Sequence, residues 1–256
     1  TLVASQEHDT SPFQLLVLHI HLHDSVVKTL TIRYMRFMST PASFHGATDI
    51  AVFTVRADVL NVLLIERACQ PFKGNWALPG GFLQSDEGLD QCAARELTEE
   101  TGISNVYLEQ LASFGDPGRD PRGGVVSVAY FALVPADEHS LRASTDAASA
   151  RWFAFDDLPQ LAFDHAVSLQ ADYVSLKAKL DYSTIAFALL PVEFTLSDLQ
   201  KVHEIIRGEP LDKRNFRKWV LALVVLEETG EKRVEGAHRP AMLYREKKPG
   251  TIKIIR

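Results

Sequence analysis

Three glutamates, Glu96, Glu99 and Glu100, have a spacing that would let them act together. On a helix, positions i, i+3 and i+4 lie on one face, so the three carboxylates would be neighbours. Each like-charged pair destabilises a helix by about 0.2–0.5 kcal/mol, and a bound cation removes that repulsion. Ligands that are all oxygen favour Mg²⁺ or Mn²⁺. The alternative is a solvated acidic helix face, which three glutamates alone would favour.

The residues around these glutamates reverse that preference. Residues 81–103 read GFLQSDEGLDQCAARELTEETGI and directly follow Leu78-Pro79-Gly80. This segment resembles the signature of the Nudix superfamily at every fixed position, and so many matches make chance a poor explanation. The chain is therefore identified as a member of that superfamily. The matching residues are Gly81, Glu87, Arg95, Glu96, Leu97, Glu99, Glu100, Gly102 and Ile103.

The resemblance implies a role for each side chain of this segment. Glu96 and Glu100 would be the leading metal ligands, and Glu99 would share the metal site or act as the general base. Gly80 would offer its carbonyl to the metal. Arg95 would orient a glutamate through a charge-assisted pair. The resemblance thus makes Glu99, Glu96 and Arg95 the catalytic residues.

The same resemblance implies the reaction. Metal ions neutralise the charge of a pyrophosphate and lower the pKa of a bound water, which attacks phosphorus. Glu87 would lie in an outer shell behind the metal ligands. The intact residues permit hydrolysis of a nucleoside diphosphate derivative such as ADP-ribose, although their presence alone does not establish it.

Four side chains near this segment are candidates for substrate contact: Arg67, Trp76, Arg119 and Arg122. The arginines of GDPGRDPRG would reach phosphates, or would simply be solvated in a turn. The tryptophan would stack on a base or, as we expect for a residue of this type, pack in the core. His165 is either a general base or a helix-capping histidine, and we favour the second interpretation.

The elements that must position these residues begin at Asp49. The apolar runs AVFTV and LNVLLIE predict a hairpin around Ala57 and Asp58. A helix is predicted over 89–101 because Gly102 offers a left-handed cap. A helix over 164–180 would connect two domains, with Ala166, Leu169, Tyr173, Leu176 and Leu180 along one side. Further strands are predicted at 106–114, 125–134 and 151–155.

The first 47 residues show neither clean helical periodicity nor strand alternation, so we interpret them as an extension of low information. Because the chain opens with Thr1, Met35 and Met38 are candidates for the native start. The stretch 13–32 is interrupted by histidines and charges and fails as a membrane span. Cys69 and Cys92 are too few for a disulfide framework, and together these features favour a cytoplasmic protein.

A second module is predicted at the C-terminal end. Thr-Leu-Ser-Asp at 195–198 resembles a capping box before a helix over 196–207, and Asp212 caps a helix over 213–224. Two short strands follow. Two helices, a tight turn and a hairpin make a winged helix-turn-helix plausible. The predicted divisions are an extension at 1–47, a Nudix domain at 48–160, a connector at 161–190 and a winged helix at 191–256.

The charge distribution supports a separate role for this module. Residues 1–194 hold 13 Lys and Arg against 24 Asp and Glu, whereas residues 195–256 hold 14 against 9. A basic amphipathic helix is usually only a solvated surface, but here a basic hairpin follows it, which favours duplex DNA as partner. The candidate DNA-binding residues are Lys213, Arg214, Asn215, Arg217, Lys218, Arg233 and Arg239.

Nearly the whole chain after residue 48 resembles the Nudix-related transcriptional regulators of NAD metabolism, the NrtR type. The resemblance rests on FKGNWALPGGF, GRDPRG, AFDH, FTLSDLQKVHE, LDKRNFRK and HRPAMLY. It implies an α+β fold, in which a Nudix α/β/α sandwich precedes a small winged helix-turn-helix domain. It also implies a homodimer on operator DNA with ADP-ribose as effector. Many such regulators have a decayed Nudix segment, and this one does not.

Three hypotheses remain from the sequence. The first is a regulator that senses ADP-ribose and also cleaves it. The second is a plain ADP-ribose or nucleotide-sugar pyrophosphatase with a C-terminal packing module. The third is a binding module without catalysis. The intact glutamates argue against the third, and the basic C-terminal module favours the first over the second.

Overall fold

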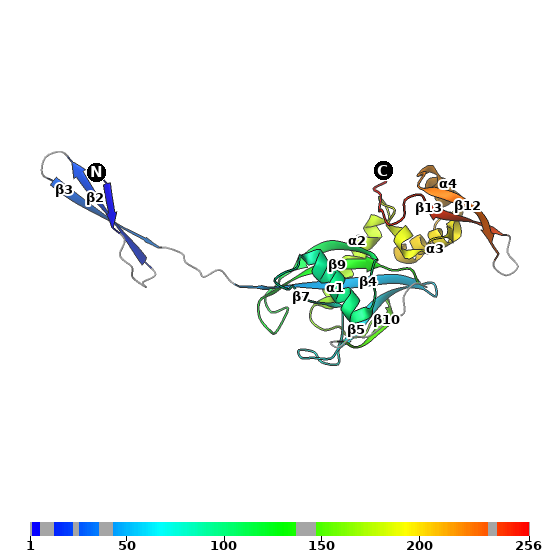
Figure 1. Cartoon of the computed structure of the whole chain (residues 1–256), viewed down its shortest axis with the longest axis horizontal. Coiled ribbons are helices and arrows are strands. Elements are labelled where there is room, and N and C mark those ends of the chain that lie inside the picture. Colours follow the sequence, from blue (N-terminus) through cyan, green and yellow to red (C-terminus); the bar gives the residue numbers. More distant parts are fainter. Residues whose placement is uncertain are drawn as a thin grey trace. The chain divides into compact units, whose positions relative to one another are not determined.

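The computed structural model describes residues 2–5, 13–22, 26–35, 43–136, 147–234 and 240–255. The chain divides into two compact units, Thr1–Ser43 and Phe44–Arg256. The first unit is an antiparallel sheet in the order β1-β2-β3 (Figure 1). Its strands are β1 (Leu2–Ser5), β2 (Phe13–Leu22) and β3 (Val26–Met35).

The interpretation that the first 47 residues show no strand alternation is therefore wrong. The strand signal lies in the segment 17–22, where histidines alternate with Leu and Ile at the period of two that strands require. The histidines that interrupt the apolar run, and so exclude a membrane span, also supply this alternation. Among the described residues, no helix is long and apolar enough to cross a membrane.

The second unit contains a seven-stranded mixed sheet in the order β10-β5-β4-β9-β8, with β6 beside β5 and β7 beside β4. Only β4 and β9, at its centre, are parallel to each other among these pairs. The strands are β4 (His45–Arg56), β5 (Val59–Arg67), β6 (Trp76–Ala77), β7 (Gly80–Phe82), β8 (Tyr107–Phe114), β9 (Val125–Leu133) and β10 (Ala147–Ala154).

Most of the predicted strands are confirmed. β4 and β5 form the expected hairpin, and its two loop residues, Ala57 and Asp58, both have positive φ, as tight hairpin turns require. β8 and β9 begin and end within one residue of the predicted ranges. β10 begins at Ala147, before the predicted start at 151, because it pairs with β5 as far as Arg67.

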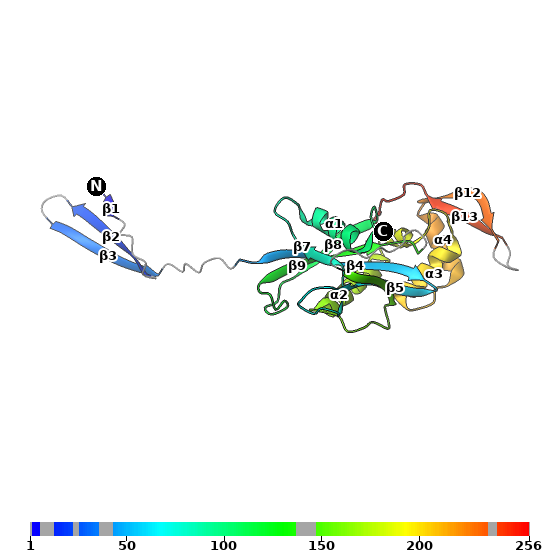
Figure 2. The ribbon, with the colours of Figure 1, turned by 60° about the horizontal axis from the view of Figure 1, so that its bottom comes forward.

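Helices cover both faces of this sheet, which confirms the α/β/α sandwich (Figure 2). Alternate residues of β4 face opposite sides: Ile50 packs with Leu97 of α1 (Leu89–Thr101), and Phe53 lies in the same core as Leu169 of α2 (His165–Lys179). Gly102 ends α1 with φ of 77°, as predicted.

The buried face of α2 differs from the prediction. Leu169 and Leu176 are buried as expected, but Ala166 is exposed. Ser168 and Asp172 take its place on the buried side, and no described residue bonds to either side chain. An apolar pattern cannot reveal a buried face that contains polar residues.

The C-terminal part is a winged helix, as predicted. Its sheet has the order β11-β13-β12 and flanks two helices. Thr195 and Asp198 form the predicted capping box, and Asp212 caps the second helix. The elements are η1 (Ile185–Leu189), β11 (Phe194–Thr195), α3 (Leu196–Arg207), α4 (Lys213–Ala222), β12 (Leu226–Arg233) and β13 (Ala241–Glu246).

The end of α3 is attached to α2. The Tyr173 hydroxyl donates to the carbonyl of Ile206 at 2.9 Å, and Lys177 Nζ donates to that of Arg207 at 2.7 Å. The last carbonyls of a helix have no partner within the helix, so these two bonds satisfy groups that otherwise need water. Residues 161–190 are therefore packed between the sheet and the winged helix, and one apolar core includes both.

Candidate active site and nucleic-acid interface

The glutamates of α1 lie near strand β7 and the loop residues just before it. Glu100 is buried, and its Oε2 accepts a hydrogen bond from the amide of Gly80 at 2.8 Å. The Glu96 side chain is 13% exposed, and burial raises its pKa although Arg95 opposes the shift. Glu99 is 56% exposed. Glu96 and Glu100 are thus packed between the helix and the loop. Their carboxylates are already desolvated before an ion binds.

Two glycines permit this close approach. Gly80 has φ of 153°, and a Cβ on it would lie 2.0 Å from the carbonyl oxygen of Thr48. A Cβ on Gly81 would lie 2.3 Å from Glu96 Oε1. Neither position accepts a side chain without movement of the backbone or of the carboxylate. The Pro-Gly-Gly sequence is therefore needed to bring backbone and acids together.

Arg95 lies among three carboxylates. It makes two bonds to Glu87, Nε to Oε2 at 2.9 Å and Nη2 to Oε1 at 2.6 Å. Its Nη1 donates to Glu96 at 2.6 Å and to Glu99 at 3.1 Å. The hydrogen bonds from Arg95 to Glu87 lower the pKa of Glu87 to about 2. The predicted charge-assisted pair between Arg95 and a glutamate is confirmed, and Glu87 holds the other side of the arginine.

A pocket opens beside Gly80. Arg67 and Arg122 both contribute to it and both lie over the ring of Phe163, at 4.8 and 5.4 Å. Arg122 also lies 4.6 Å from the ring of Phe82. Burial, and then the charge of Arg122, lower the pKa of Arg67. Arg119 also lines the pocket. Arginines and aromatic rings beside the carboxylates of α1 suit a ligand with phosphates and a flat ring.

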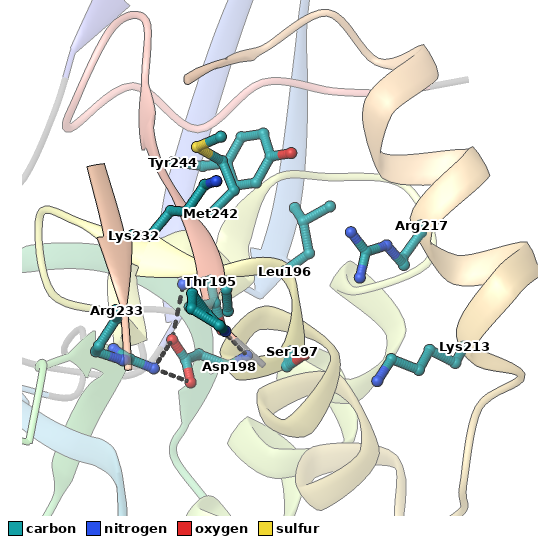
Figure 3. Close-up of a pocket in the computed structure, with 12 residues that line it drawn as sticks. Thr195, Leu196, Ser197, Asp198, Lys213, Arg217, Lys232, Arg233, Met242 and Tyr244 are labelled. Carbon is teal, nitrogen blue, oxygen red and sulfur yellow. Dashed lines mark hydrogen bonds and ion pairs between the residues drawn. The ribbon is translucent and has the colours of Figure 1, made fainter. Parts of the chain in front are cut away.

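A groove lies between α3, α4 and the β12–β13 hairpin (Figure 3). Lys213 and Arg217 extend into it from α4, and Lys232 lines it from β12. Phe216 and Val220 bury the opposite side of α4. The arrangement leaves cations on a protruding helix and on an adjacent strand, which is the distribution that DNA-binding winged helices use.

Comparisons with known proteins match both parts of the chain after residue 43. Residues 44–171 match the NUDIX domain, and residues 186–245 match the NrtR DNA-binding winged helix domain. Over 201 residues, the chain is 42% identical to the "ADPR responsive transcriptional repressor NtrR" of Acinetobacter baylyi, which covers 77% of this chain and 80% of that protein. The chain belongs to the NrtR family. The resemblance inferred from the motifs is confirmed.

Two further relatives of this NrtR-family chain match it over different lengths. The structure of Shewanella oneidensis NrtR complexed with a 27mer DNA matches with a TM-score of 0.70 and 37% identity, over 78% of this chain and 93% of that one. The ADP-ribose pyrophosphatase of Methanocaldococcus jannaschii is 41% identical over 116 residues, or 45% of this chain and 67% of that protein.

The side chain of Arg119 is mostly buried and bonded to carboxylates, whereas the sequence suggested a phosphate contact or a solvated side chain. Its side chain is only 6% exposed, and it bonds to both oxygens of Asp164, at 2.9 and 2.6 Å, and to Asp49 at 3.2 Å. Burial opposes its charge, but these carboxylates raise its pKa above the ordinary value. In this NrtR-family chain Arg119 therefore fastens its loop to the start of α2, and it also lines the pocket beside Gly80. Its contact with phosphates stays a prediction.

His165 supports the metal-side loop. It is buried, its Nδ1 accepts a hydrogen bond from the amide of Leu78 at 2.9 Å, and its Nε2 lies 3.5 Å from Asp49 Oδ1. Burial lowers its pKa. The ring does not cap α2, so the interpretation that we favoured is wrong. A neutral ring that holds the segment before Gly80 is equally unsuited to act as a base in solvent.

Trp76 packs rather than lining the pocket. Its ring lies 4.7 Å from that of Phe153, and Arg151 covers it at 5.4 Å. The core interpretation of this tryptophan is confirmed. Phe163 and Phe82 supply the aromatic faces of the pocket instead, and the sequence signal for the first was the AFDH motif.

The predicted DNA-binding residues fall into three groups. Those on α4 are all exposed: Lys213, Arg214, Asn215, Arg217 and Lys218. Arg233 on β12 is engaged with Asp198. Arg239 lies outside the described residues. Lys232, which was not among the predicted contacts, faces the same groove as Lys213.

Proposed function

We propose that this chain is an ADP-ribose-responsive transcriptional regulator whose Nudix site also hydrolyses ADP-ribose. The observation that carries the proposal is the pocket of Arg67, Arg122 and Phe163. Gly80 and Gly81 also line it, and these glycines lie against Glu100 and Glu96 of α1. A relative named for ADP-ribose response and another named ADP-ribose pyrophosphatase support the choice of ligand.

The proposed cofactor is Mg²⁺ or Mn²⁺, held by Glu96, Glu100, Glu99 and the Gly80 carbonyl. The donor set is all oxygen, as these ions prefer, and two of the carboxylates are already packed beside the loop. In the described part of the chain no three acidic, histidine or cysteine side chains converge in metal-binding geometry, and Arg95 bonds to Glu96 and Glu99. Ion binding would exchange some of those bonds for metal ligands. When bound, the ion neutralises pyrophosphate charge and lowers the pKa of a bound water.

The chain's own residues provide the remaining functions. Arg67 and Arg122 bind the phosphates, and Phe163 stacks against the adenine ring. His165 and Arg119 keep the loop before Gly80 and the start of α2 in place. Glu99, the most exposed of the three glutamates, is positioned to take a proton from water. Addition of water to the pyrophosphate then yields AMP and ribose 5-phosphate.

The winged helix binds duplex operator DNA, and α4 is the helix that enters the major groove. The chain acts as a homodimer in the cytoplasm and controls genes of NAD metabolism. The groove of Lys213, Arg217 and Lys232 favours this regulator over a plain pyrophosphatase, because a packing module has no need of converging cations.

The test has two arms. The purified chain with Mg²⁺ or Mn²⁺ should release AMP from ADP-ribose, and release should stop when EDTA removes the metal. In a gel shift, the chain should retard a duplex from the region upstream of its own gene, and ADP-ribose should weaken that complex. Absence of AMP would refute hydrolysis, and absence of any retarded band at low salt would refute the regulator.

A further inference from the structure

The groove of Figure 3 contains one acidic side chain among its described lining residues, Asp198. An acid on a surface that meets DNA repels phosphates unless its charge is neutralised. Here both carboxylate oxygens accept from Arg233 Nη2, at 2.7 and 2.6 Å. Oδ2 also accepts from the amide of Thr195 at 2.7 Å. The carboxylate thus joins the start of α3 to strand β12.

Strand β12 needs such an attachment. It is an edge strand, paired only with β13, and its register shifts between Glu228 and Lys232. The pairs that remain beyond the shift are Lys232 with Met242 and Arg233 with Ala241. In the described part of the hairpin, two pairings and the ion pair with Asp198 contribute to holding the end of β12 that carries Lys232.

The geometry of α4 separates two kinds of contact. Lys213 and Arg217 are four residues apart, lie on the flank beside the groove and face the start of α3 (Figure 3). Arg214 and Lys218 are turned away from buried Phe216 by about half a turn. If α4 enters the major groove, as proposed, the outer pair would meet base edges, and Lys213, Arg217 and Lys232 would meet the backbone of one strand.

We propose that Asp198 is a positioning residue for DNA binding. It fixes β12 against α3, so that Lys232 stands opposite Lys213 and Arg217 and the three cations bind a backbone phosphate of the duplex. Asp198 itself touches no DNA. The inference rests on the proposed DNA-binding function. From its negative charge alone, Asp198 would be expected to weaken DNA binding, whereas here it strengthens binding.

The test is the sign of the change in affinity for Asp198→Asn. If Asp198 were only an acid near DNA, its removal would reduce repulsion and tighten binding. As a positioning residue, its loss should weaken binding roughly tenfold and lower the slope of log K against log salt by about 1, equally for operator and for a scrambled duplex. The matched control is Glu227→Gln, which breaks the exposed Glu227–Arg245 pair on the same hairpin and should change little.

A double-mutant cycle with Arg233→Gln separates positioning from misfolding. The double variant should bind no more weakly than either single variant, because both remove the same attachment. Circular dichroism and the melting temperature check that α3 is intact, since Asp198 also belongs to its capping box. Tighter binding by Asp198→Asn, or an effect equal to that of Glu227→Gln, overturns the inference. A parent chain that binds no duplex would instead refute the proposed function.

Discussion

The acidic site of α1 and the basic groove of the winged helix are arranged in opposite ways. In each, several like charges surround one residue of the other sign: Arg95 among glutamates, and Asp198 beside lysines and arginines. Arg95 bonds directly to two of the proposed ligand groups, so binding must displace it in part. Asp198 bonds to the framework and leaves Lys213, Lys232 and Arg217 exposed to a ligand.

This difference teaches how each site meets its partner. Glu96 and Glu100 are largely buried, and a desolvated carboxylate is costly without a partner, so each is bonded to a donor within the protein. The groove cations are in water, which stabilises them without any partner. One site therefore exchanges partners on binding, and the other only loses solvent and counterions.

The largest expected effect concerns the acidic site. Glu100→Gln keeps the shape of the side chain that accepts from the Gly80 amide but removes its charge. We expect AMP release to fall by roughly 100-fold or more, as for loss of a metal ligand. Glu209→Gln, at an exposed acid, is the control. A Glu100→Gln variant that still releases AMP at the parent's rate would remove Glu100 from the proposed ligands.

The next effect concerns the groove. Arg214→Ala together with Arg217→Ala should abolish specific DNA binding, a loss of roughly 100-fold or more. The single changes sharpen the comparison: Arg214→Ala should reduce the preference for operator over scrambled duplex, and Arg217→Ala should weaken both equally. Lys248→Ala, at an exposed residue outside the groove, is the control for lost charge. Equal binding by the double variant and the parent would argue against α4 as the recognition helix.

A smaller effect joins the two regions. ADP-ribose should weaken operator binding about 5- to 150-fold, measured without divalent metal so that the ligand is not consumed. Tyr173→Phe removes the bond from α2 to the Ile206 carbonyl and should reduce this coupling by about 0.5–2 kcal/mol. Tyr182→Phe, on an exposed ring, is the control. Operator affinity that stays constant up to ligand saturation would mean that the two regions are merely tethered.

The smallest expected effect is on stability. Burial, and then the charge of Asp49, raise the pKa of Asp172 to about 8. A raised carboxyl pKa in the folded state means that stability is greatest below about pH 4 for this group and falls as the pH rises toward 8. Asp172→Asn should therefore raise the melting temperature by several degrees at pH 8 and by little at pH 5. An equal gain at both pH values would contradict a protonated Asp172.

The sequence predicted the local features of both regions well. The helix of Glu96 and Glu100, the left-handed Gly102 and the capping box of Thr195 all depend on neighbouring residues, so their patterns are visible in one segment. The division of α4 into a buried and a basic face follows from its period in the same way. The divisions assigned to the chain as domains stay predictions.

What the sequence missed depends on residues that are distant in the chain. Asp49 on β4 accepts from Ser127 on β9 and from Arg119, and no spacing rule relates these positions. A buried arginine and a solvated one look the same in a Gly-rich turn, so the bonds from Arg119 to Asp49 and Asp164 could not be foreseen. Phe163, in the AFDH motif, has a positive φ of 55°, a conformation that apolar periodicity does not reveal.

The two bonds that attach the end of α3 to α2 have a geometric consequence. A helix of 12 residues is about 18 Å long, so α3 acts as a lever whose near end is held by Tyr173 and Lys177 and whose far end carries Asp198. A tilt of about 5° at the near end moves the far end by about 1.6 Å, which is greater than the range of about 0.5 Å over which an N–H···O bond stays favourable. Such a small rotation would suffice to part the carboxylate from its arginine.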